Sequence, residues 1–311
     1  MKFSITIPAY KQRYLYEAIE SCLAQTYKDF ELIIVDDASP EDLKTVVDKF
    51  HDDRIRYYRN EKNCGALNVV DNWNICLSYA KGDYVICMGD DDRLLPHCLE
   101  EYLLLLKKYP NLNVYHALTE IIDDNSRLCY MQEMRPEREG VFSMIYGRLH
   151  NRRQQYIGDW LFSVKWLKSN GGYVNNPMAW GSDDLTAFIA AQRGGVANSQ
   201  VPMFQYRENQ QTISSCGNTF VKIQAMSITF GIIKEMLDEK SDELTDLEQH
   251  YRQTIQRVFH DVVHSSMSSL LQQSVVSNGI FNSFYWWIKY RKKYEISCSE
   301  LLKAIIKSLN K

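Results

Sequence analysis

The chain has 311 residues, of which 45% are hydrophobic and 24% charged, and its 36 basic and 39 acidic side chains give a formal net charge of −3. These fractions are average for globular proteins, so they predict one or two folded domains and exclude collagen-like, low-complexity and disordered classes. The near-neutral charge argues against a general nucleic-acid binder, because such proteins usually carry a basic excess. We expect no membrane span and no secretion signal, and eight scattered cysteines without a CxxC pair predict reduced thiols rather than a zinc site.

Strands and helices alternate over the first 120 residues. Short apolar runs predict strands at 3–8, 30–35, 55–58, 84–88 and 114–117. Helical periodicity predicts helices at 14–25, 43–50, 66–80 and 96–107, with Ser39 as N-cap and Pro40 at the first position of the second helix. Such alternation predicts a parallel sheet with helices on both faces, whose ligands bind beyond the carboxyl ends of the strands.

The rest of the chain is less regular and then becomes helical. Residues 120–210 show no simple pattern, whereas apolar residues from Phe220 to Leu237 step by three or four and predict an amphipathic helix, followed by a second helix at 247–271. The composition changes near 210–218, so we predict an α/β domain at 1–212 and a C-terminal helical region at 213–311.

The C-terminal tail combines aromatic and basic residues. Phe284-Tyr285-Trp286-Trp287 precedes seven Lys or Arg residues between 289 and 311. Aromatic and basic side chains together can seat a protein on an anionic membrane surface, so peripheral membrane contact through this tail is one hypothesis. The alternative is an ordinary helix that packs through Trp286 and keeps its lysines in water.

Acidic residues follow the second and fourth predicted strands. Asp90, Asp91 and Asp92 are consecutive, and adjacent like charges raise one another's pKa. A divalent cation removes this repulsion, because Mg²⁺ and Mn²⁺ prefer carboxylate oxygens and usually share them with substrate phosphates. The chain has no GxGxxG or GxxxxGK[ST] loop, so a metal would be the main neutraliser of a phosphate. The alternative for Asp90–Asp92 is a solvated acidic turn. At the end of the second predicted strand, we favour Asp37 as a ligand-binding residue.

These motifs together resemble a known family. Pro8-Ala9-Tyr10, the run from Glu31 to Ser39, Asn63 with Gly65, and Gly89-Asp90-Asp91-Asp92 followed by Pro96 resemble the family 2 nucleotide-sugar glycosyltransferases. The resemblance extends over about residues 3–207 and is most specific over 3–110. It implies a GT-A fold, a Rossmann-like mixed α/β sheet flanked by helices, with 213–311 as a C-terminal helical extension.

The resemblance also implies roles for individual residues. Pro8, Ala9, Tyr10 and Asp37 would hold the nucleotide, usually uridine, and Asn63 and Gly65 belong to the same nucleotide-binding set. Asp92 would be the metal ligand, and Asp90 or Asp91 would face the ribose. This chain has Gly89 where the family usually has its first aspartate, so the choice between Asp90 and Asp91 stays open.

The catalytic base and the acceptor side are expected later in the chain. Gly181-Ser182-Asp183-Asp184-Leu185 resembles the position of the family's base; the following residues slightly favour Asp184, whereas Gly181-Ser182 favour Asp183. An acidic first turn of a helix is the alternative for this pair. Trp180 could stack on a sugar or belong to the core, and Gly172 is expected in an acceptor-side turn.

The sequence therefore predicts an inverting, metal-dependent glycosyltransferase. It would use Mn²⁺ or Mg²⁺ to move a sugar from a nucleotide-sugar donor, most simply a UDP-sugar, to a hydroxyl of a glycan or lipid-linked acceptor in cell-surface polysaccharide or glycoconjugate biosynthesis. We expect a cytoplasmic protein with no nucleic-acid partner. The alternatives are a sugar nucleotidyltransferase, disfavoured because Lys11-Gln12-Arg13 offers no glycine loop, and a non-catalytic sugar- or nucleotide-binding relative.

Overall fold

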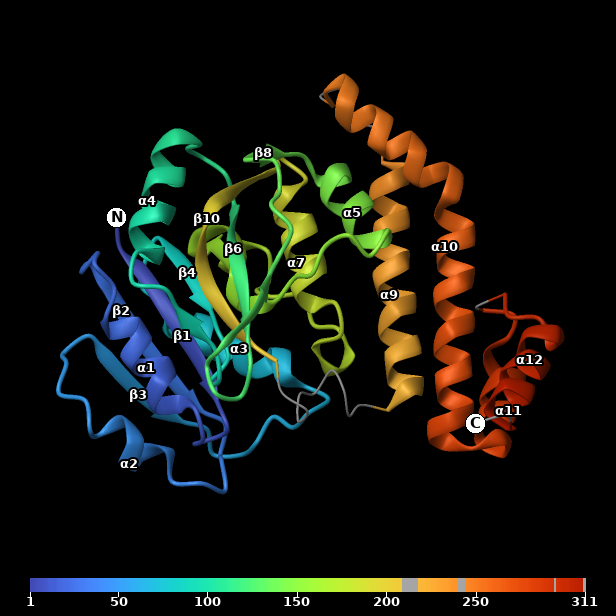
Figure 1. The fold of residues 1–311 in the computed structure, drawn as a ribbon, viewed down its shortest axis with the longest axis horizontal. Coiled ribbons are helices and arrows are strands. Elements are labelled where there is room, and N and C mark those ends of the chain that lie inside the picture. The colour runs from blue at the N-terminus through green and yellow to red at the C-terminus, as the bar shows by residue number, and fades with distance from the viewer. Residues whose placement is uncertain (209–217, 240–243, 294, 310–311) are drawn as a thin grey trace. The chain divides into compact units, whose positions relative to one another are not determined.

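The computed structural model describes residues 1–208, 218–239, 244–293 and 295–309 (Figure 1). Two compact units are present, one made of residues 1–175 and 182–212 and the other of residues 176–181 and 213–311. The domain boundary predicted at 212/213, like Cys216 and Lys311, lies outside the described residues. Within the described ranges, no helix has both the length and the apolar character needed to cross a bilayer.

The first unit is built on a mixed sheet. Its strands are β1 (Phe3–Ala9), β2 (Phe30–Asp36), β3 (Ile55–Arg59), β4 (Tyr84–Cys87), β5 (Arg93–Leu94), β6 (Val114–Ile122), β7 (Leu128–Met131), β8 (Arg138–Glu139), β9 (Trp160–Ser163) and β10 (Val196–Arg207). The order is β3-β2-β1-β4-β9-β6-β10-β5, with β7 paired to β6 and β8 to β10. The first four strands run parallel, whereas β9 is antiparallel to both β4 and β6.

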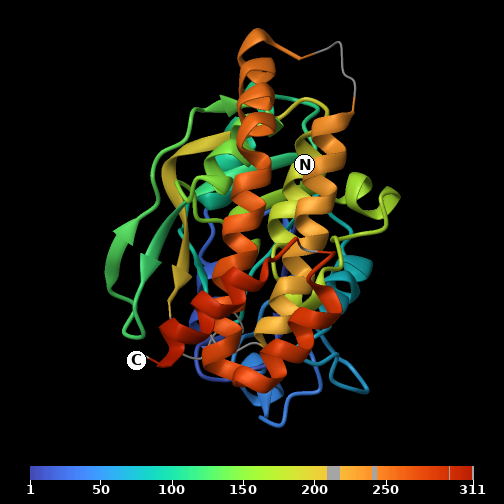
Figure 2. The same ribbon diagram turned by 90° about the vertical axis from the view of Figure 1, so that its right-hand side faces the viewer.

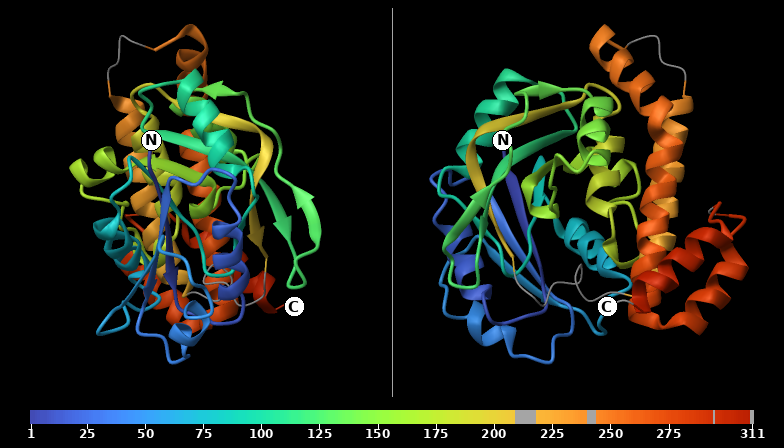
Figure 3. Two further views of the ribbon diagram at one scale, coloured as in Figure 1. Left: turned by 90° about the vertical axis from the view of Figure 1, so that its left-hand side faces the viewer. Right: turned by 45° about the vertical axis from the view of Figure 1, so that its right-hand side comes forward.

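Helices cover both faces of this sheet. They are α1 (Leu15–Leu23), α2 (Leu43–Val47), α3 (Val69–Tyr79), α4 (Cys98–Lys108), α5 (Val141–Leu149), α6 (Val164–Ser169) and α7 (Ser182–Ala191), with a 3₁₀ turn η1 (Ile157–Asp159). Helices α1, α2 and α4 share one apolar core with β1 and β2. Helix α3 lies on the opposite face of the sheet (Figure 3). The strand and helix order expected over the first 117 residues is therefore present.

The start of α2 differs from the prediction. Asp42, not Ser39, is its N-cap, and the Asp42 side chain accepts a hydrogen bond from the Thr45 amide at 3.2 Å. Ser39 instead donates its hydroxyl to the carbonyl oxygen of Tyr10 at 2.6 Å. The Ser39 side chain is thereby used to join the loop after β2 to the loop after β1.

The second unit is helical. It contains the 3₁₀ turn η2 (Pro177–Ala179) and helices α9 (Thr219–Asp238), α10 (Asp246–Asn278), α11 (Ile280–Tyr290) and α12 (Cys298–Leu309). The long helices α9 and α10 lie side by side (Figure 2). The side chains of Asn218 and Thr245 cap their N-termini. Helix α10 runs beyond the predicted 271 to Asn278 and is followed by Gly279 with φ of 79°.

The two tryptophans of the tail point inward. Trp286 and Trp287 are buried; the first stacks on Phe220 with ring centroids 5.4 Å apart, and the second donates its indole N–H to the Ile296 carbonyl at 3.0 Å. These two tryptophans are therefore not available to a membrane surface, while membrane contact through other residues of the tail stays a prediction. Their burial agrees with the alternative, in which the helix packs through Trp286.

Candidate active site

Asp90 joins the loop after β4 to the loop after β1. Its Oδ2 atom accepts hydrogen bonds from the backbone N–H groups of Tyr10 and Lys11, both at 2.6 Å. Burial, and then the neighbouring Asp91 carboxylate, raise the pKa of Asp90 to about 6. The predicted nucleotide loop at Pro8–Tyr10 is thus held in place by a carboxylate of the predicted metal loop.

The two aspartates that end β2 have different surroundings. Asp36 is fully buried and accepts from the Tyr57 hydroxyl at 2.6 Å, from the Ser39 amide at 2.8 Å and from Arg59. Burial, together with the Asp36 carboxylate, raises the pKa of Tyr57 to about 12. These contacts give Asp36 a structural role.

Asp37 organises the loop that carries Asn63 and Gly65. Its carboxylate accepts from Asn60 Nδ2 at 2.8 Å, from Asn63 Nδ2 at 3.1 Å and from the Cys64 amide at 3.0 Å. Asn63 also donates to the Asp37 carbonyl at 2.7 Å, and Gly65 follows with φ of 80°. The structure therefore brings together three residues that the sequence predicts to bind the nucleotide.

Gly89 allows two carboxylates to lie close to the backbone of the loop. A Cβ atom built there would lie 2.8 Å from Asp91 Oδ1 and 2.9 Å from Asp92 Oδ2. Asp92 accepts from the Arg207 amide at 3.0 Å and the Gly89 amide at 3.2 Å. Burial, and then the charge of Asp91, raise the pKa of Asp92 well above its ordinary value. Two carboxylate oxygens held close together, one with a raised pKa, suit a hard divalent cation.

The protein alone supplies only part of a coordination sphere. Among the described residues, no group of three His, Cys, Asp or Glu side chains is arranged to hold a metal ion. Mg²⁺ commonly binds through one or two carboxylates and completes its sphere with water and substrate phosphates. The Asp91–Asp92 pair fits that pattern.

Substituting Gly89 by Ala is expected to weaken Mn²⁺ binding at least about tenfold, because the new methyl group would displace the Asp91 and Asp92 carboxylates that a metal needs. Isothermal calorimetry with Mn²⁺ in the presence of UDP measures this. Gly231→Ala is the matched control, since a Cβ there meets nothing within 4 Å. Unchanged Mn²⁺ affinity in Gly89→Ala would contradict the metal assignment.

Arg207, at the end of β10, supports the metal loop from beneath. Its side chain is fully buried. Its Nε atom donates to the Asp91 carbonyl at 2.8 Å, and its backbone amide donates to Asp92 Oδ1 at 3.0 Å. One residue thereby positions both Asp91 and Asp92.

The same guanidinium binds the turn between β6 and β7, the hairpin seen in Figure 3. Its Nη1 atom donates to the Asp123 carbonyl at 2.9 Å and to Ser126 Oγ at 3.0 Å, and Nη2 donates to Glu17 at 3.0 Å. The guanidinium also lies 4.0 Å from the centre of the Tyr14 ring. The arginine therefore joins α1, the β6–β7 turn and the metal loop.

Arg207→Ala is expected to lower the free energy of unfolding by about 3 kcal/mol, because it leaves buried carbonyl acceptors without a donor. The thermal midpoint should fall by roughly 6–12 °C, followed by circular dichroism. Arg93→Ala is the control, since Arg93 is partly exposed and lies 3.9 Å from Glu17. Equal effects of the two substitutions would contradict the central role of Arg207.

The two aspartates at the start of α7 also differ. Asp184 is buried, and its Oδ2 accepts from Arg148 Nε at 2.8 Å, while its Oδ1 is buried without a partner in the described part of the chain. Asp183 is only partly buried. Burial, and then the charge of Asp184, raise the pKa of Asp183 to about 8. A carboxylate with a raised pKa that an incoming hydroxyl can reach has the properties of a general base.

Tyr206 connects the metal loop with the α7 pair. Its ring stacks on Tyr156 with centroids 3.6 Å apart. Burial raises the pKa of the Tyr206 hydroxyl, and the carboxylates of Asp92, Asp91 and Asp183 add to this rise. Charges from both acidic clusters thus act on the Tyr206 side chain.

The predicted acceptor-side residues lie in different units. Gly172 has φ of 93°, and a Cβ there would lie 2.2 Å from Asn74 Oδ1, so the glycine permits a close contact with α3. Trp180 belongs to the second unit, where the Lys222 ammonium lies 4.5 Å from the centre of its ring. Their acceptor roles remain predictions.

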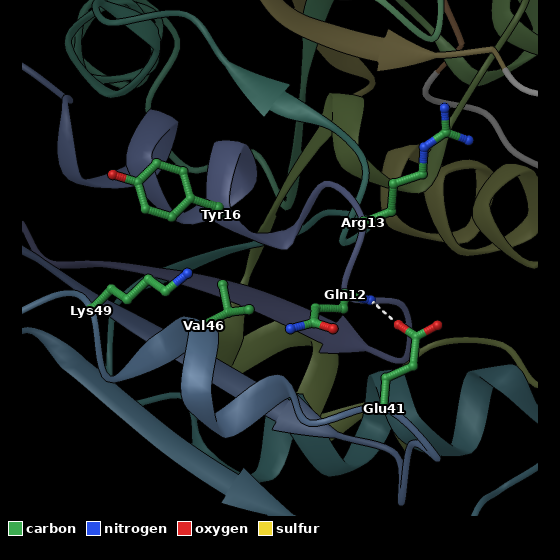
Figure 4. A pocket seen from close by; sticks show the side chains of 6 residues that line it. All are labelled: Gln12, Arg13, Tyr16, Glu41, Val46 and Lys49. Atoms are coloured by element: carbon green, nitrogen blue, oxygen red, sulfur yellow. Dashed lines mark hydrogen bonds between the residues drawn. The ribbon is translucent and has the colours of Figure 1, made fainter.

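A surface pocket of about 450 Å³ lies beside α1 and α2 (Figure 4). Its lining side chains are Gln12, Arg13, Tyr16, Glu41, Val46 and Lys49. The Gln12 amide donates to Glu41 at 2.5 Å across one end of it. None of the predicted site residues lines this pocket, so we place the site at the strand-end loops instead.

Comparison with known proteins decides the family. The model of "Glycosyl transferase family 2" matches residues 4–167, which is more than half of the chain. The chain belongs to glycosyl transferase family 2. The match includes β1, β2 and the Asp90–Asp92 loop, whereas α7 lies beyond it. Membership of family 2 agrees with the family resemblance found in the sequence.

Relatives and solved structures agree with family 2. An uncharacterised glycosyltransferase of Rickettsia typhi is 31% identical over 48% of this chain and 46% of its own length. The "GalNAc(5)-diNAcBac-PP-undecaprenol beta-1,3-glucosyltransferase" of Campylobacter jejuni is 39% identical over 32% of each chain. The chain thus spans less than half the length of these curated relatives.

A solved structure matches nearly the whole chain. Residues 1–349 of S. aureus TarS in complex with UDP-GlcNAc superpose with a TM-score of 0.62 and 16% identity, covering 98% of this chain and 89% of that one. The mixed sheet with flanking helices and the C-terminal helices therefore confirm the expected GT-A fold.

Proposed function

We propose that this protein is an inverting, metal-dependent glycosyltransferase that moves a sugar from a UDP-sugar to a hydroxyl of a glycan or lipid-linked acceptor. The observation that carries the proposal is the joining of the loops after β1, β2 and β4: Asp90 accepts from the Tyr10 and Lys11 amides, and the Asp37 amide donates to the Ala9 carbonyl at 2.9 Å. We assign the nucleotide to Asp37, the diphosphate to the Asp91–Asp92 pair and the acceptor to the Asp183–Asp184 pair.

The donor side rests on the loops after β1 and β2. Asp37 is held by Asn60, Asn63 and the Cys64 amide, so its loop is preorganised for a nucleobase beside Pro8–Tyr10. Asp90 is engaged by the Tyr10 and Lys11 amides, and we assign the ribose contact, beside a share in the metal, to Asp91. The UDP-GlcNAc named for the TarS complex is consistent with a uridine donor.

Mn²⁺ or Mg²⁺ would be held by Asp92 with Asp91, whose carboxylates lie close to Gly89. A bound divalent cation stabilises the negative charge that develops on a diphosphate leaving group. Arg207 contributes by holding the Asp91 carbonyl and the Asp92 carboxylate in position.

We infer that Asp183 accepts the proton of the acceptor hydroxyl. The acceptor oxygen forms a bond to the anomeric carbon as the carbon–oxygen bond to the diphosphate breaks, and the bonding electrons leave with UDP. A single displacement inverts the anomeric centre. Arg148 Nε pairs with Asp184 Oδ2 at 2.8 Å, and the charge of Asp184 adds to the rise in the pKa of Asp183, which makes Asp183 a stronger base. The residues that follow Asp184 in the sequence slightly favour Asp184 as the base, so Asp183→Asn and Asp184→Asn are compared below.

The proposed acceptor class follows the chemistry named for one relative. The Campylobacter relative is named for a polyprenol-linked glycan, and the acceptor class proposed here is of the same chemistry. We place the protein in the cytoplasm, in the biosynthesis of cell-surface polysaccharide or glycoconjugate.

A thermal-shift measurement tests donor binding. Saturating UDP with Mn²⁺, at about 100 times its Kd, should stabilise the folded protein by about 2.7 kcal/mol. This corresponds to a rise of roughly 5–10 °C in the thermal midpoint. CDP, GDP and ADP serve as controls and should give smaller shifts. The absence of a shift with every nucleoside diphosphate would contradict the proposal and favour a non-catalytic scaffold.

A further inference from the structure

Helix α11 packs through one face against the other helices of the second unit. Ser283, Trp286 and Trp287 are buried on this face. Ser283 Oγ pairs with Ser274 of α10 at 3.2 Å, and the Trp287 indole N–H is bound by the Ile296 carbonyl. The inward orientation of this helix is therefore determined by both packing and hydrogen bonds.

The opposite face of α11 is also apolar, although it lies in water. Phe281 is 90% exposed, Tyr285 71% and Ile288 53%, and Phe284 lies beside them. Residues at i, i+3, i+4 and i+7 share one side of a helix, so these four side chains form a continuous stripe. We call Phe281, Phe284, Tyr285 and Ile288 the outer face. Such a stripe is unfavourable in water and indicates a partner surface.

Positive charge gathers at the C-terminal end of this helix. Lys289, Arg291, Lys292 and Lys293 are all exposed, and Arg291 lies 5.0 Å from the centre of the Trp287 ring. Helix α11 itself contains no acidic residue. An exposed apolar stripe that ends in four cations is the pattern of a helix lying in the plane of an anionic membrane.

We propose that the outer face of α11 and the four cations after it seat the protein on an anionic lipid bilayer. Phe281, Tyr285 and Ile288 enter the boundary between headgroups and acyl chains, while the cations contact lipid phosphates. Membrane binding by these residues does not depend on the transferase reaction, so the membrane proposal and the transferase proposal can fail independently.

Charge decides between a membrane and a second copy of the chain. A dimer with two parallel α11 helices would bring two sets of Lys289, Arg291, Lys292 and Lys293 close together, and an antiparallel dimer would leave both sets without an acidic partner on α11. An anionic surface attracts the same cations. Each Lys or Arg near such a surface contributes about 1 kcal/mol, which is about a fivefold gain in binding.

Vesicle co-sedimentation of the full chain tests the proposal. Binding is expected to vesicles of phosphatidylglycerol and phosphatidylcholine, to weaken with added salt, and to be lost on pure phosphatidylcholine. Lys292→Glu/Lys293→Glu should lower binding by at least about 25-fold, because two attractive charges become repulsive. Phe281→Glu/Tyr285→Glu should also lower vesicle binding, because it places charge on the outer face.

Matched controls lie elsewhere in the same unit. Leu247 is exposed and near the start of α10, a helix of 33 residues that spans about 50 Å. Leu247→Glu and the exposed Arg257→Glu on α10 should bind vesicles like the unmodified chain. Circular dichroism and the fluorescence of buried Trp286 and Trp287 report whether each variant is folded.

Three results would overturn the proposal. The first is no sedimentation with anionic vesicles. The second is equal binding by folded outer-face variants and by the controls. The third is a dimer in light scattering that the outer-face substitutions convert to a monomer, which would assign the face to a second copy.

Discussion

Replacing Asp92 by Asn should reduce Mn²⁺-dependent release of UDP from a UDP-sugar by about 1000-fold or more. The substitution removes one of the two carboxylates beside Gly89, and metal stabilisation of a leaving group is worth several kcal/mol. The buried position of Asp92 and its amide donors allow Asn to fit with a small change in packing. A coupled assay for UDP measures the loss.

The control for Asp92→Asn is a carboxylate remote from the strand-end loops. Asp48 is exposed and paired with Lys44 one turn earlier on the surface, so Asp48→Asn should retain full activity. Thermal unfolding should show that both variants are folded. Full Mn²⁺-dependent activity in Asp92→Asn would remove Asp92 from the proposed metal site.

Asp183→Asn should lower kcat by about 10²–10⁴-fold, the usual contribution of a general base. Donor binding should persist, because Asp183 contacts none of the nucleotide loops by hydrogen bond in the described structure. Calorimetry with UDP and Mn²⁺ measures binding, and UDP release measures turnover. A variant that retains turnover would contradict the assignment of Asp183.

The pH dependence distinguishes Asp183 from Asp184. A general base acts only when ionised, so kcat should fall as the pH drops below the Asp183 pKa of about 8. Asp184→Asn removes the negative charge that raises this pKa and leaves Arg148 to lower it. The acidic limb of the kcat profile should therefore move to lower pH in Asp184→Asn. Loss of turnover in Asp184→Asn with an unaltered Asp183→Asn enzyme would make Asp184 the base.

The strand-end part of the site follows from local patterns. Apolar runs that end in Pro8, Asp36-Asp37 and Gly89–Asp92 mark strands and the loops after them, and parallel strands bring such loops to one edge. The structure places Asp37 and Asp90 there with the expected partners nearby. Local sequence is sufficient here because each loop directly follows its strand.

The supporting residues depend on contacts that sequence spacing does not reveal. Arg207 binds Glu17, 190 residues away, and Arg148 binds Asp184, 36 residues away. Buried arginines are rare, and nothing in the pattern around Tyr206-Arg207 separates them from surface positions. The register of β10 beside β6 brings Arg207 to the metal loop, and that register is a property of the whole sheet.

The tail shows a similar limit. Helical periodicity indicates that Trp286 and Trp287 lie on one side of α11 and Phe281, Tyr285 and Ile288 on the other. Both sides are apolar, so periodicity cannot tell which one packs inward. Packing against α10 and the Ile296 carbonyl buries the tryptophans, and the phenylalanine side is left exposed.

The most direct test of the transferase proposal is nucleoside diphosphate release across a panel of nucleotide-sugars, with Mn²⁺ or Mg²⁺ and with Asp92→Asn as the blank. We expect UDP release from at least one UDP-sugar, dependent on the metal and absent in Asp92→Asn. Failure of every UDP-sugar, with release from a donor carrying another base or from none, would contradict the account.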